Sequence, residues 1–97
     1  MELTTFNFQD IIDSNDTVIV DFWAPWCGPC KRYKPTFEEF SSKSNALCCT
    51  VNVEAEPSLS EDYDIKSIPC TIVFENGSEK LRKLGILSMS DLEALDS

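Results

Sequence analysis

One stretch of sequence decides how this chain folds: Val20-Asp21-Phe22-Trp23-Ala24-Pro25-Trp26-Cys27-Gly28-Pro29-Cys30-Lys31. It begins inside an almost continuous apolar run, residues 17–23, and such runs are typical of a central strand that is covered on both faces. Pro25 and the Gly28-Pro29 pair interrupt this pattern. Helical spacing follows, because aromatic residues recur at positions 33, 37 and 40. The stretch therefore predicts a strand, a tight connection that carries two cysteines, and a helix.

Shorter signals outside this stretch predict the remaining elements. The Asn76-Gly77 pair is a strong hairpin signal, and it predicts that residues 80–84 return antiparallel to a strand over residues 71–74. Ser88, with Asp91 three residues later, is a capping pattern for a last helix. The other predicted elements are a helix capped by Asn7, a strand over residues 46–53, a short helix that begins at Pro57, and an edge strand over residues 3–6.

These elements predict a single domain of the α/β class. Strand, helix and strand alternate before the hairpin, which gives a mixed central β-sheet with helices on both of its faces. The connection between the first two strands should be right-handed. A chain of 97 residues fits one domain, and we assign residues 1–97 to it.

The charge balance excludes several classes of function. The chain has 8 basic and 17 acidic side chains, a net charge of −9 and no histidine. Such an acidic chain repels phosphate backbones, so we expect no nucleic-acid partner. No apolar run approaches the roughly 20 residues that cross a bilayer, and the first residues do not resemble a signal peptide, so we expect no membrane association. Without histidine, Ser-His and Cys-His catalysis within one chain are excluded.

The cysteines indicate a reducing compartment. There are five of them, Cys27, Cys30, Cys48, Cys49 and Cys70, at irregular spacing. A secreted disulfide scaffold usually has an even number of cysteines and carries a signal. We therefore expect a cytoplasmic protein in which most of these residues are thiols. The last three lie on predicted strands, where a free cysteine usually serves as a small buried hydrophobe.

The Cys27-Gly28-Pro29-Cys30 motif carries the chemistry. It follows a predicted strand and opens a predicted helix, which is the context in which a C-x-x-C motif indicates redox activity. At the helix N-terminus Cys27 faces the positive end of the helix dipole, which favours the nucleophilic thiolate. Cys30 lies one turn further in, is less exposed, and is within reach of a disulfide bond to Cys27. Pro29 restricts the turn and removes one backbone donor, so we expect it to tune the pair.

From Val20 to Lys31 the sequence resembles the active-site segment of the thioredoxin family almost letter for letter. Weaker matches follow in order along nearly the whole chain: Pro35, Pro57, Tyr63, Ser67-Ile68-Pro69, Phe74, Asn76-Gly77 and Gly85. The resemblance implies the thioredoxin fold and a general protein disulfide reductase that acts by dithiol–disulfide exchange. In that reaction Cys27 is the nucleophile and Cys30 the resolving cysteine. No cofactor motif is present; a separate reductase, usually a flavoprotein that draws on NADPH, restores the dithiol in this family.

The resemblance also assigns roles to residues outside the motif. Asp21 matches an aspartate that lies beneath the cysteine pair and assists proton transfer to or from the buried cysteine. Pro69 matches a cis-proline that faces the cysteines, and the backbone of Ile68 would pair with an extended substrate segment. The apolar docking surface of the family is matched by Trp26, Ile68, Leu84, Gly85 and Ile86. We expect a monomer whose partners are disulfide-containing proteins and thioredoxin reductase.

Two positions depart from the family pattern. Thr50 stands where many members have a lysine close to the buried aspartate, which should raise the proton affinity of Asp21. Cys70 follows Pro69 where the family usually has threonine, and it could offer a third thiol near the pair. Structural readings compete with the assigned roles: Asp21 as a hydrogen-bonded structural carboxylate, Pro69 as an ordinary trans proline, and Trp26 as a core residue.

Other functions compete with that of a reductase. The main alternative is a glutathione-linked or isomerase-like oxidoreductase of the same fold, although the Gly28-Pro29 pair favours a reductant over an isomerase. A structural zinc site is a further alternative, whose four thiolates would come from Cys27, Cys30, Cys48 and Cys49. Because adjacent residues on a strand point to opposite faces, we predict no metal there. A binding module without catalysis is the last alternative, and the intact cysteine pair argues against it.

Overall fold

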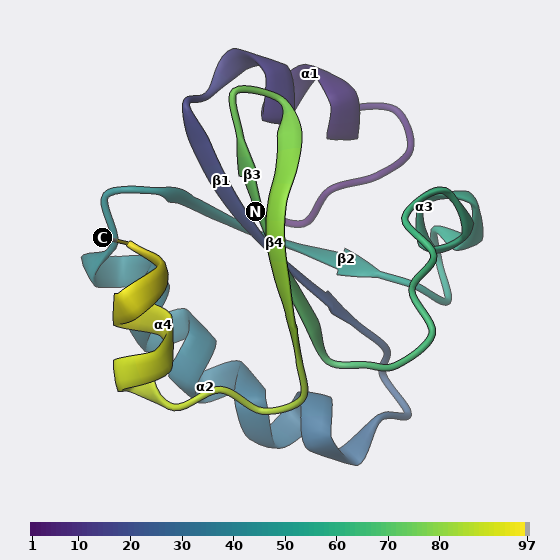
Figure 1. Cartoon of the computed structure of the whole chain (residues 1–97). Coiled ribbons are helices and arrows are strands. Elements are labelled where there is room, and N and C mark those ends of the chain that lie inside the picture. The colour runs from purple at the N-terminus through teal and green to yellow at the C-terminus, as the bar shows by residue number, and fades with distance from the viewer. Residues whose placement is uncertain (97) are drawn as a thin grey trace.

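The structure, a computed structural model that describes residues 1–96, contains four strands and four helices in these residues (Figure 1). Along the chain they are α1 Phe8–Ser14, β1 Thr17–Trp23, α2 Gly28–Lys43, β2 Leu47–Asn52, α3 Pro57–Asp62, β3 Cys70–Glu75, β4 Ser78–Leu84 and α4 Met89–Leu95. The predicted order of elements is confirmed, and β4 begins earlier than predicted. Within residues 1–96 no helix combines the length and the apolar character needed to span a membrane.

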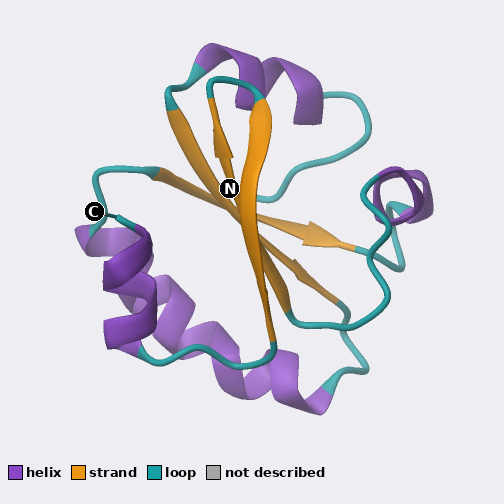
Figure 2. Ribbon diagram, in the orientation of Figure 1, coloured by secondary structure: helices purple, strands orange, loops and turns teal. Residues whose placement is uncertain are grey.

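The sheet has the strand order β2-β1-β3-β4 (Figure 2). β1 runs parallel to β2, whereas the β1–β3 and β3–β4 pairs are antiparallel. This is the mixed sheet that the sequence predicts, since α2 returns the chain to a parallel neighbour of β1 and the turn at Asn76-Gly77 reverses it. β1 is therefore a central strand with partners on both edges, which explains its apolar run.

Helices cover both faces of the sheet, α1 and α3 on one face and α2 and α4 on the other (Figures 1 and 2). Successive side chains of β1 point to opposite faces of the sheet. Val20 therefore packs in the layer of α1 and α3, and Ile19 packs in the layer of α2 and α4. Cys48 and Cys49 are divided between the layers in the same way. This arrangement separates Cys49 from α2, and among residues 1–96 no group of three or more metal-ligating side chains gathers.

The N-terminal segment differs from the prediction. Residues 3–6 do not form an edge strand, because pairing with β2 is limited to one bridge between Glu2 and Thr50. Leu3 is fully buried, and the chain turns at Thr4, whose N–H donates to the side-chain oxygen of Asn7 over 2.8 Å. That bond occupies the oxygen with which Asn7 was expected to cap α1, so Asn7 holds the N-cap position without a side-chain cap. Burial of Leu3 and the turn together end the strand pairing.

The other turn and cap signals are confirmed. Asn76 and Gly77 have φ values of 52° and 84°, the left-handed pair that a two-residue hairpin turn requires. Ser88 and Asp91 form a capping box at the start of α4, in which each side chain accepts a hydrogen bond from the backbone N–H of the other residue. The hairpin places β4 at the edge of the sheet, and the cap fixes where α4 begins.

Replacing Gly77 by alanine should destabilise the fold more than the same change at Gly85. Both glycines have φ near +85°, a conformation that costs an L-residue about 1–2 kcal/mol. A Cβ at Gly77 would lie 2.6 Å from Oδ1 of Asp13, whereas a Cβ at Gly85 would meet nothing within 4 Å. Oδ1 ends a flexible side chain that can move away, but it then loses the hydrogen bond of 3.0 Å from Gln9 Nε2. Urea unfolding should therefore give a free energy of unfolding that Gly77→Ala lowers by about 0.5 kcal/mol more than Gly85→Ala. Adding Asp13→Ala should remove this difference; equal losses for the two glycines would contradict the argument.

Candidate active site

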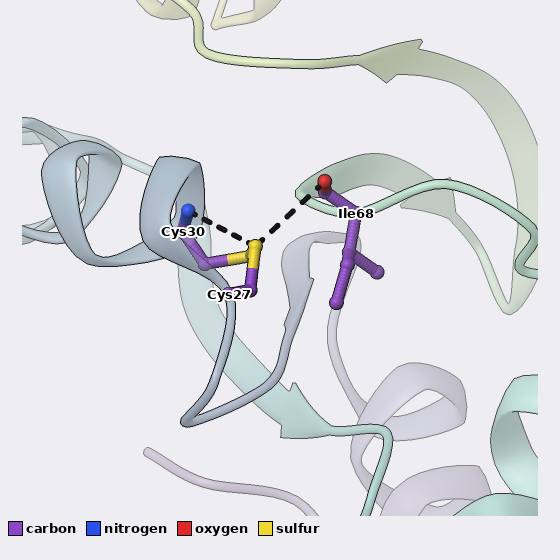
Figure 3. The surroundings of a disulfide bond; sticks show 3 residues. All are labelled: Cys27, Cys30 and Ile68. Atoms are coloured by element: carbon purple, nitrogen blue, oxygen red, sulfur yellow. Dashed lines mark hydrogen bonds between the residues drawn. A yellow bond between two sulfur atoms is a disulfide. The ribbon is translucent and has the colours of Figure 1, made fainter.

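Cys27 and Cys30 form a disulfide at the start of α2 (Figure 3). Cys27 is the N-cap residue of the helix, and the two Cα atoms are 5.2 Å apart. The N–H of Cys30 donates to the sulfur of Cys27 over 3.2 Å, so the sulfur takes the place of a capping oxygen. In the reduced protein the same donor and the positive end of the helix dipole favour a thiolate at Cys27. The predicted location of the pair at a helix N-terminus is confirmed.

The loop before β3 faces this pair. The Ile68–Pro69 peptide bond is cis, as the family resemblance implies, so the reading of Pro69 as a trans proline is wrong. The carbonyl oxygen of Ile68 points towards the sulfur of Cys27 at 3.8 Å (Figure 3). The carbonyl of Pro69 accepts a hydrogen bond of 2.9 Å from the N–H of Gly85. The loop thus lies against Cys27 through Ile68 and is bonded to Gly85 through Pro69.

Apolar side chains are exposed on these same segments. Cys27 is 6% and Cys30 3% exposed, so only a small part of the pair reaches the surface, and Cys30 is the more buried cysteine, as predicted. Trp26 is 67% exposed, which makes the reading of this residue as part of the core wrong. Leu84 and Ile86, on either side of Gly85, are also exposed. Exposed apolar groups beside a reactive sulfur are typical of a surface that contacts another protein.

Asp21 lies in the interior of β1, between Thr50 of β2 and Thr71 of β3. Its side chain is 4% exposed, and Oδ1 has no hydrogen-bond partner among residues 1–96. Burial raises the pKa of Asp21 to about 7, because the carboxylate form loses its water. The strand register confirms that Thr50 is the neighbour of Asp21 on β2. The missing partner for Oδ1 also argues against a purely structural, hydrogen-bonded carboxylate.

A cavity of about 550 Å³ connects Asp21 with the buried side of the disulfide. Cys30 and Thr50 line it together with Asp21, and Lys34 of α2 is another of its lining residues. The indole Nε1 of Trp23 is buried without a protein partner, as Asp21 Oδ1 is, and Trp23 lines the same cavity. Lys34 is one of three basic residues that follow Cys30 in the sequence, with Lys31 and Arg32, but no local pattern indicated that Lys34 lies beside the cavity of Asp21.

The remaining cysteines, Cys48, Cys49 and Cys70, are free and buried. Burial raises the pKa of all three thiols, that of Cys49 to about 11. Cys70 packs in the layer of α1 and α3, whereas Cys27 and Cys30 belong to a separate apolar cluster with Ala24. These thiols behave as the small buried hydrophobes that the sequence favoured, and Cys70 does not join the reactive pair.

The arrangement of the cysteine pair, the cis-proline loop and the buried aspartate agrees with the resemblance noted in the sequence. A family model described as Thioredoxin matches residues 1–95. The chain belongs to the thioredoxin family. Members of the thioredoxin family are protein disulfide oxidoreductases, and the Cys27–Cys30 pair is the redox-active centre of this member. The chain is therefore a thiol–disulfide oxidoreductase with the function of a protein disulfide reductase.

Individual relatives support this membership. Thioredoxin of Mycoplasma genitalium is 42% identical over 80 residues, which cover 81% of this chain and 78% of that protein. Thioredoxin M5, chloroplastic, of rice is 34% identical over 88% of this chain, and the match spans about half (51%) of that protein. A bifunctional thioredoxin reductase/thioredoxin of Mycobacterium leprae is 38% identical over 80% of this chain and 18% of that protein. The solved structure of Plasmodium falciparum thioredoxin has a TM-score of 0.91 at 38% identity and covers 97% of this chain and 93% of that one.

Asp21→Asn should stabilise the folded protein at high pH. Burial raises the pKa of Asp21 from 3.8 to about 7, so unfolding releases a proton between these pH values and stability falls as the pH rises through this window. Above pH 8 the buried carboxylate costs up to about 4 kcal/mol, which asparagine does not incur. The advantage of the variant in urea unfolding should therefore grow from pH 4 to pH 8 and then level off. An advantage that is independent of pH would contradict the raised pKa.

Proposed function

We propose that the chain reduces protein disulfides by attack of the Cys27 thiolate. A bond forms between the sulfur of Cys27 and one substrate sulfur while the substrate disulfide breaks, and the other substrate sulfur leaves as a thiolate that takes up a proton. The thiolate of Cys30 then attacks the sulfur of Cys27 in this mixed disulfide. The Cys27–Cys30 bond forms, and the second substrate sulfur leaves. The substrate gains the two electrons that the cysteine pair loses.

One observation carries the division of roles between the cysteines: the N–H of Cys30 donates to the sulfur of Cys27 at the N-cap of α2. This donor favours a thiolate at Cys27, whereas Cys30 is the more buried and suits a resolving role. Gly28 and Pro29 occupy the first helical positions, where the missing N–H of proline leaves no helical bond unmade. We propose that these two residues and Pro69 tune the pair.

Asp21 is proposed to accept the proton that Cys30 loses before it attacks. Asp21 and Cys30 line the same cavity, and a pKa of about 7 lets the carboxyl group gain or lose a proton near neutral pH. The unpaired Oδ1 of Asp21 is free to bond to water in that cavity, which supplies a path when the two groups are not in direct contact.

Protein substrates are proposed to dock on Trp26, Ile68, Leu84, Gly85 and Ile86. Trp26 offers a large exposed aromatic surface next to Cys27, and the backbone of Ile68 would pair with an extended segment of the substrate. Gly85 has no Cβ, so a partner chain can approach closely between the exposed side chains of Leu84 and Ile86. The docking surface thus combines main-chain hydrogen bonds with apolar contacts.

We propose a monomer that is located in the cytoplasm. A separate thioredoxin reductase that draws on NADPH is the proposed source of electrons for the cysteine pair. The similarity to a bifunctional thioredoxin reductase/thioredoxin supports this source, because there the two activities are part of one protein. The alternative is regeneration by glutathione. Measuring how fast each reductant, glutathione or thioredoxin reductase with NADPH, reduces the oxidised protein separates these functions. Rapid reduction by glutathione alone, together with a reduction potential of the Cys27–Cys30 pair as oxidising as that of an isomerase, would overturn the assignment.

Cys27→Ser and Cys30→Ser should fail in different ways. Cys27→Ser removes the attacking sulfur, so disulfide reduction should fall to background in a turbidity assay with insulin. Cys30→Ser leaves the attacking sulfur but cannot resolve the intermediate, so it should accumulate a mixed disulfide that non-reducing electrophoresis detects. Trapping by Cys27→Ser through Cys30 instead would reverse the two roles. Cys49→Ser, at a free cysteine in the layer away from α2, is the matched control and should behave like the parent.

Trp26→Ala should lower the catalytic efficiency with protein substrates more than with small disulfides. The side chain is 67% exposed, so its removal leaves the core intact while it deletes contact area beside Cys27. We expect kcat/KM for insulin to fall about three- to tenfold, equivalent to the loss of ~1 kcal/mol of contact in the transition state. Turnover of a small aromatic disulfide should change less. Phe6→Ala, at an exposed aromatic residue before α1, controls for the loss of surface area, and an equal effect of both variants would contradict the docking role.

A further inference from the structure

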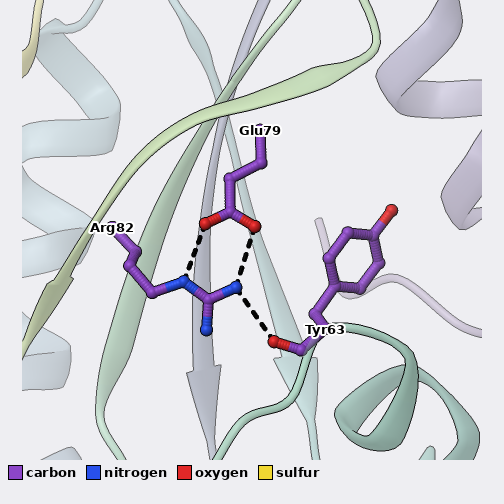
Figure 4. Close-up of polar contacts among 3 residues, drawn as sticks. All are labelled: Tyr63, Glu79 and Arg82. Carbon is purple, nitrogen blue, oxygen red and sulfur yellow. Dashed lines mark hydrogen bonds and ion pairs between the residues drawn. The ribbon is translucent and has the colours of Figure 1, made fainter.

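Arg82 makes three hydrogen bonds, two to Glu79 within β4 and one that ties β4 to the start of the loop after α3 (Figure 4). Its Nε and Nη2 donate to the two carboxylate oxygens of Glu79 over 2.7 and 2.8 Å, and Nη2 also donates to the backbone carbonyl of Tyr63 over 2.9 Å. The side chains of Arg82 and Glu79 are each 31% exposed, less than those in any other ion pair of residues 1–96. A bidentate pair of this kind fixes the plane of the guanidinium group.

The carbonyl that Arg82 holds is the start of the loop that carries Ile68. Tyr63 is the C-cap residue of α3, and its ring lies in a cluster with the rings of Phe8, Phe22 and Phe74. The next residue, Asp64, has a left-handed φ of 52°, so the chain changes direction here. Arg82 therefore holds the loop at the point where it leaves the core.

Residues of β4 or directly after it hold both ends of this loop. At the first end Arg82 binds the carbonyl of Tyr63, and at the second the N–H of Gly85 binds the carbonyl of Pro69. Between them lies Ile68, whose carbonyl is 3.8 Å from the sulfur of Cys27. The two anchors, Arg82 and Gly85, are three residues apart in the sequence. Because Ile68 lies between the two residues that they bind, a displacement of Tyr63 should move Ile68 relative to Cys27.

We propose that Arg82 is a positioning residue for protein substrates, which holds the loop 63–69 so that the backbone of Ile68 is ready to pair with an extended peptide beside Cys27. The inference rests on the proposed docking function of Ile68 and extends it to a residue outside the docking surface. Arg82 itself binds neither cysteine: its bonds go to Glu79 and Tyr63. The effect is therefore on binding of a peptide main chain and not on the exchange of sulfur bonds.

Arg82→Met tests this proposal, with Lys80→Met as the matched control on the same strand. Lys80 forms a more exposed ion pair with Glu75, so its loss removes a charge from β4 without touching the loop. We expect Arg82→Met to raise KM for a protein disulfide such as insulin about three- to tenfold with kcat unchanged, as for a loss of uniform binding. Turnover of a small aromatic disulfide, which has no peptide main chain, should stay within twofold of the parent, as should both substrates with Lys80→Met.

Two further variants keep the test independent of folding. Arg82→Lys retains the charge and one donor for Tyr63 but loses the bidentate contact, and Glu79→Gln retains the bond from Arg82 to Tyr63; both should raise KM less than Arg82→Met. The N–H of Ile65 donates to the carbonyl of Ser60 over 2.9 Å at the start of the loop. Its amide hydrogen exchange should be faster in Arg82→Met, while exchange at Ile72 in β3 should be unchanged. An unchanged KM for insulin, or an equal loss on both substrates, overturns the positioning role. Failure of the parent protein to reduce either substrate would instead reject the proposed function itself.

Discussion

The junction between the end of β1 and the start of α2 is the constraint on which the rest of the structure depends. β1 has hydrogen-bonded partners on both edges, and the fully buried Ala24 holds the short connection against the cysteine pair. The helix must therefore begin where its unbonded N–H groups meet the sulfur of Cys27. A small shift of α2 along β1 would separate that sulfur from the carbonyl of Ile68. The packing of a strand and a helix in this way positions a single reactive atom.

The buried carboxyl group of Asp21 works against stability at this junction. A threonine on each neighbouring strand leaves it without a cation across the sheet, and burial raises its pKa to about 7. An apolar residue would fill a central strand with less loss of free energy. Stability is commonly given up where a function needs an unfavourable group. The proposed proton transfer between Asp21 and Cys30, which line the same cavity, would be such a function.

The edge strand β4 contributes more to the site than its exposure suggests. Its exposed face carries charged side chains, which protect an unpaired edge from joining other sheets. Its far end supplies the apolar Leu84, and the following Gly85 binds the carbonyl of Pro69. Arg82 holds the carbonyl of Tyr63 from the same strand. A strand that adds little to the core, together with the glycine that follows it, thus binds both ends of the loop that carries Ile68.

The sequence alone determined most helices and strands and the reactive cysteine pair. These features depend on local patterns, namely apolar periodicity, turn residues and the spacing of Cys27 and Cys30, which involve residues close together in the sequence. It also identified Asp21 as a carboxyl group in a buried strand, and the family resemblance supplied the cis bond at Pro69. It misassigned residues 3–6, where the burial of Leu3 and the use of the Asn7 side chain decide the path. The resemblance also placed the loop of Ile68 and Pro69 against the cysteines, and the structure bears this out. Only the tertiary structure brought Lys34 to the cavity of Asp21 and Arg82 to Tyr63. Those contacts join segments from different elements, and no local pattern encodes how such segments pack against one another.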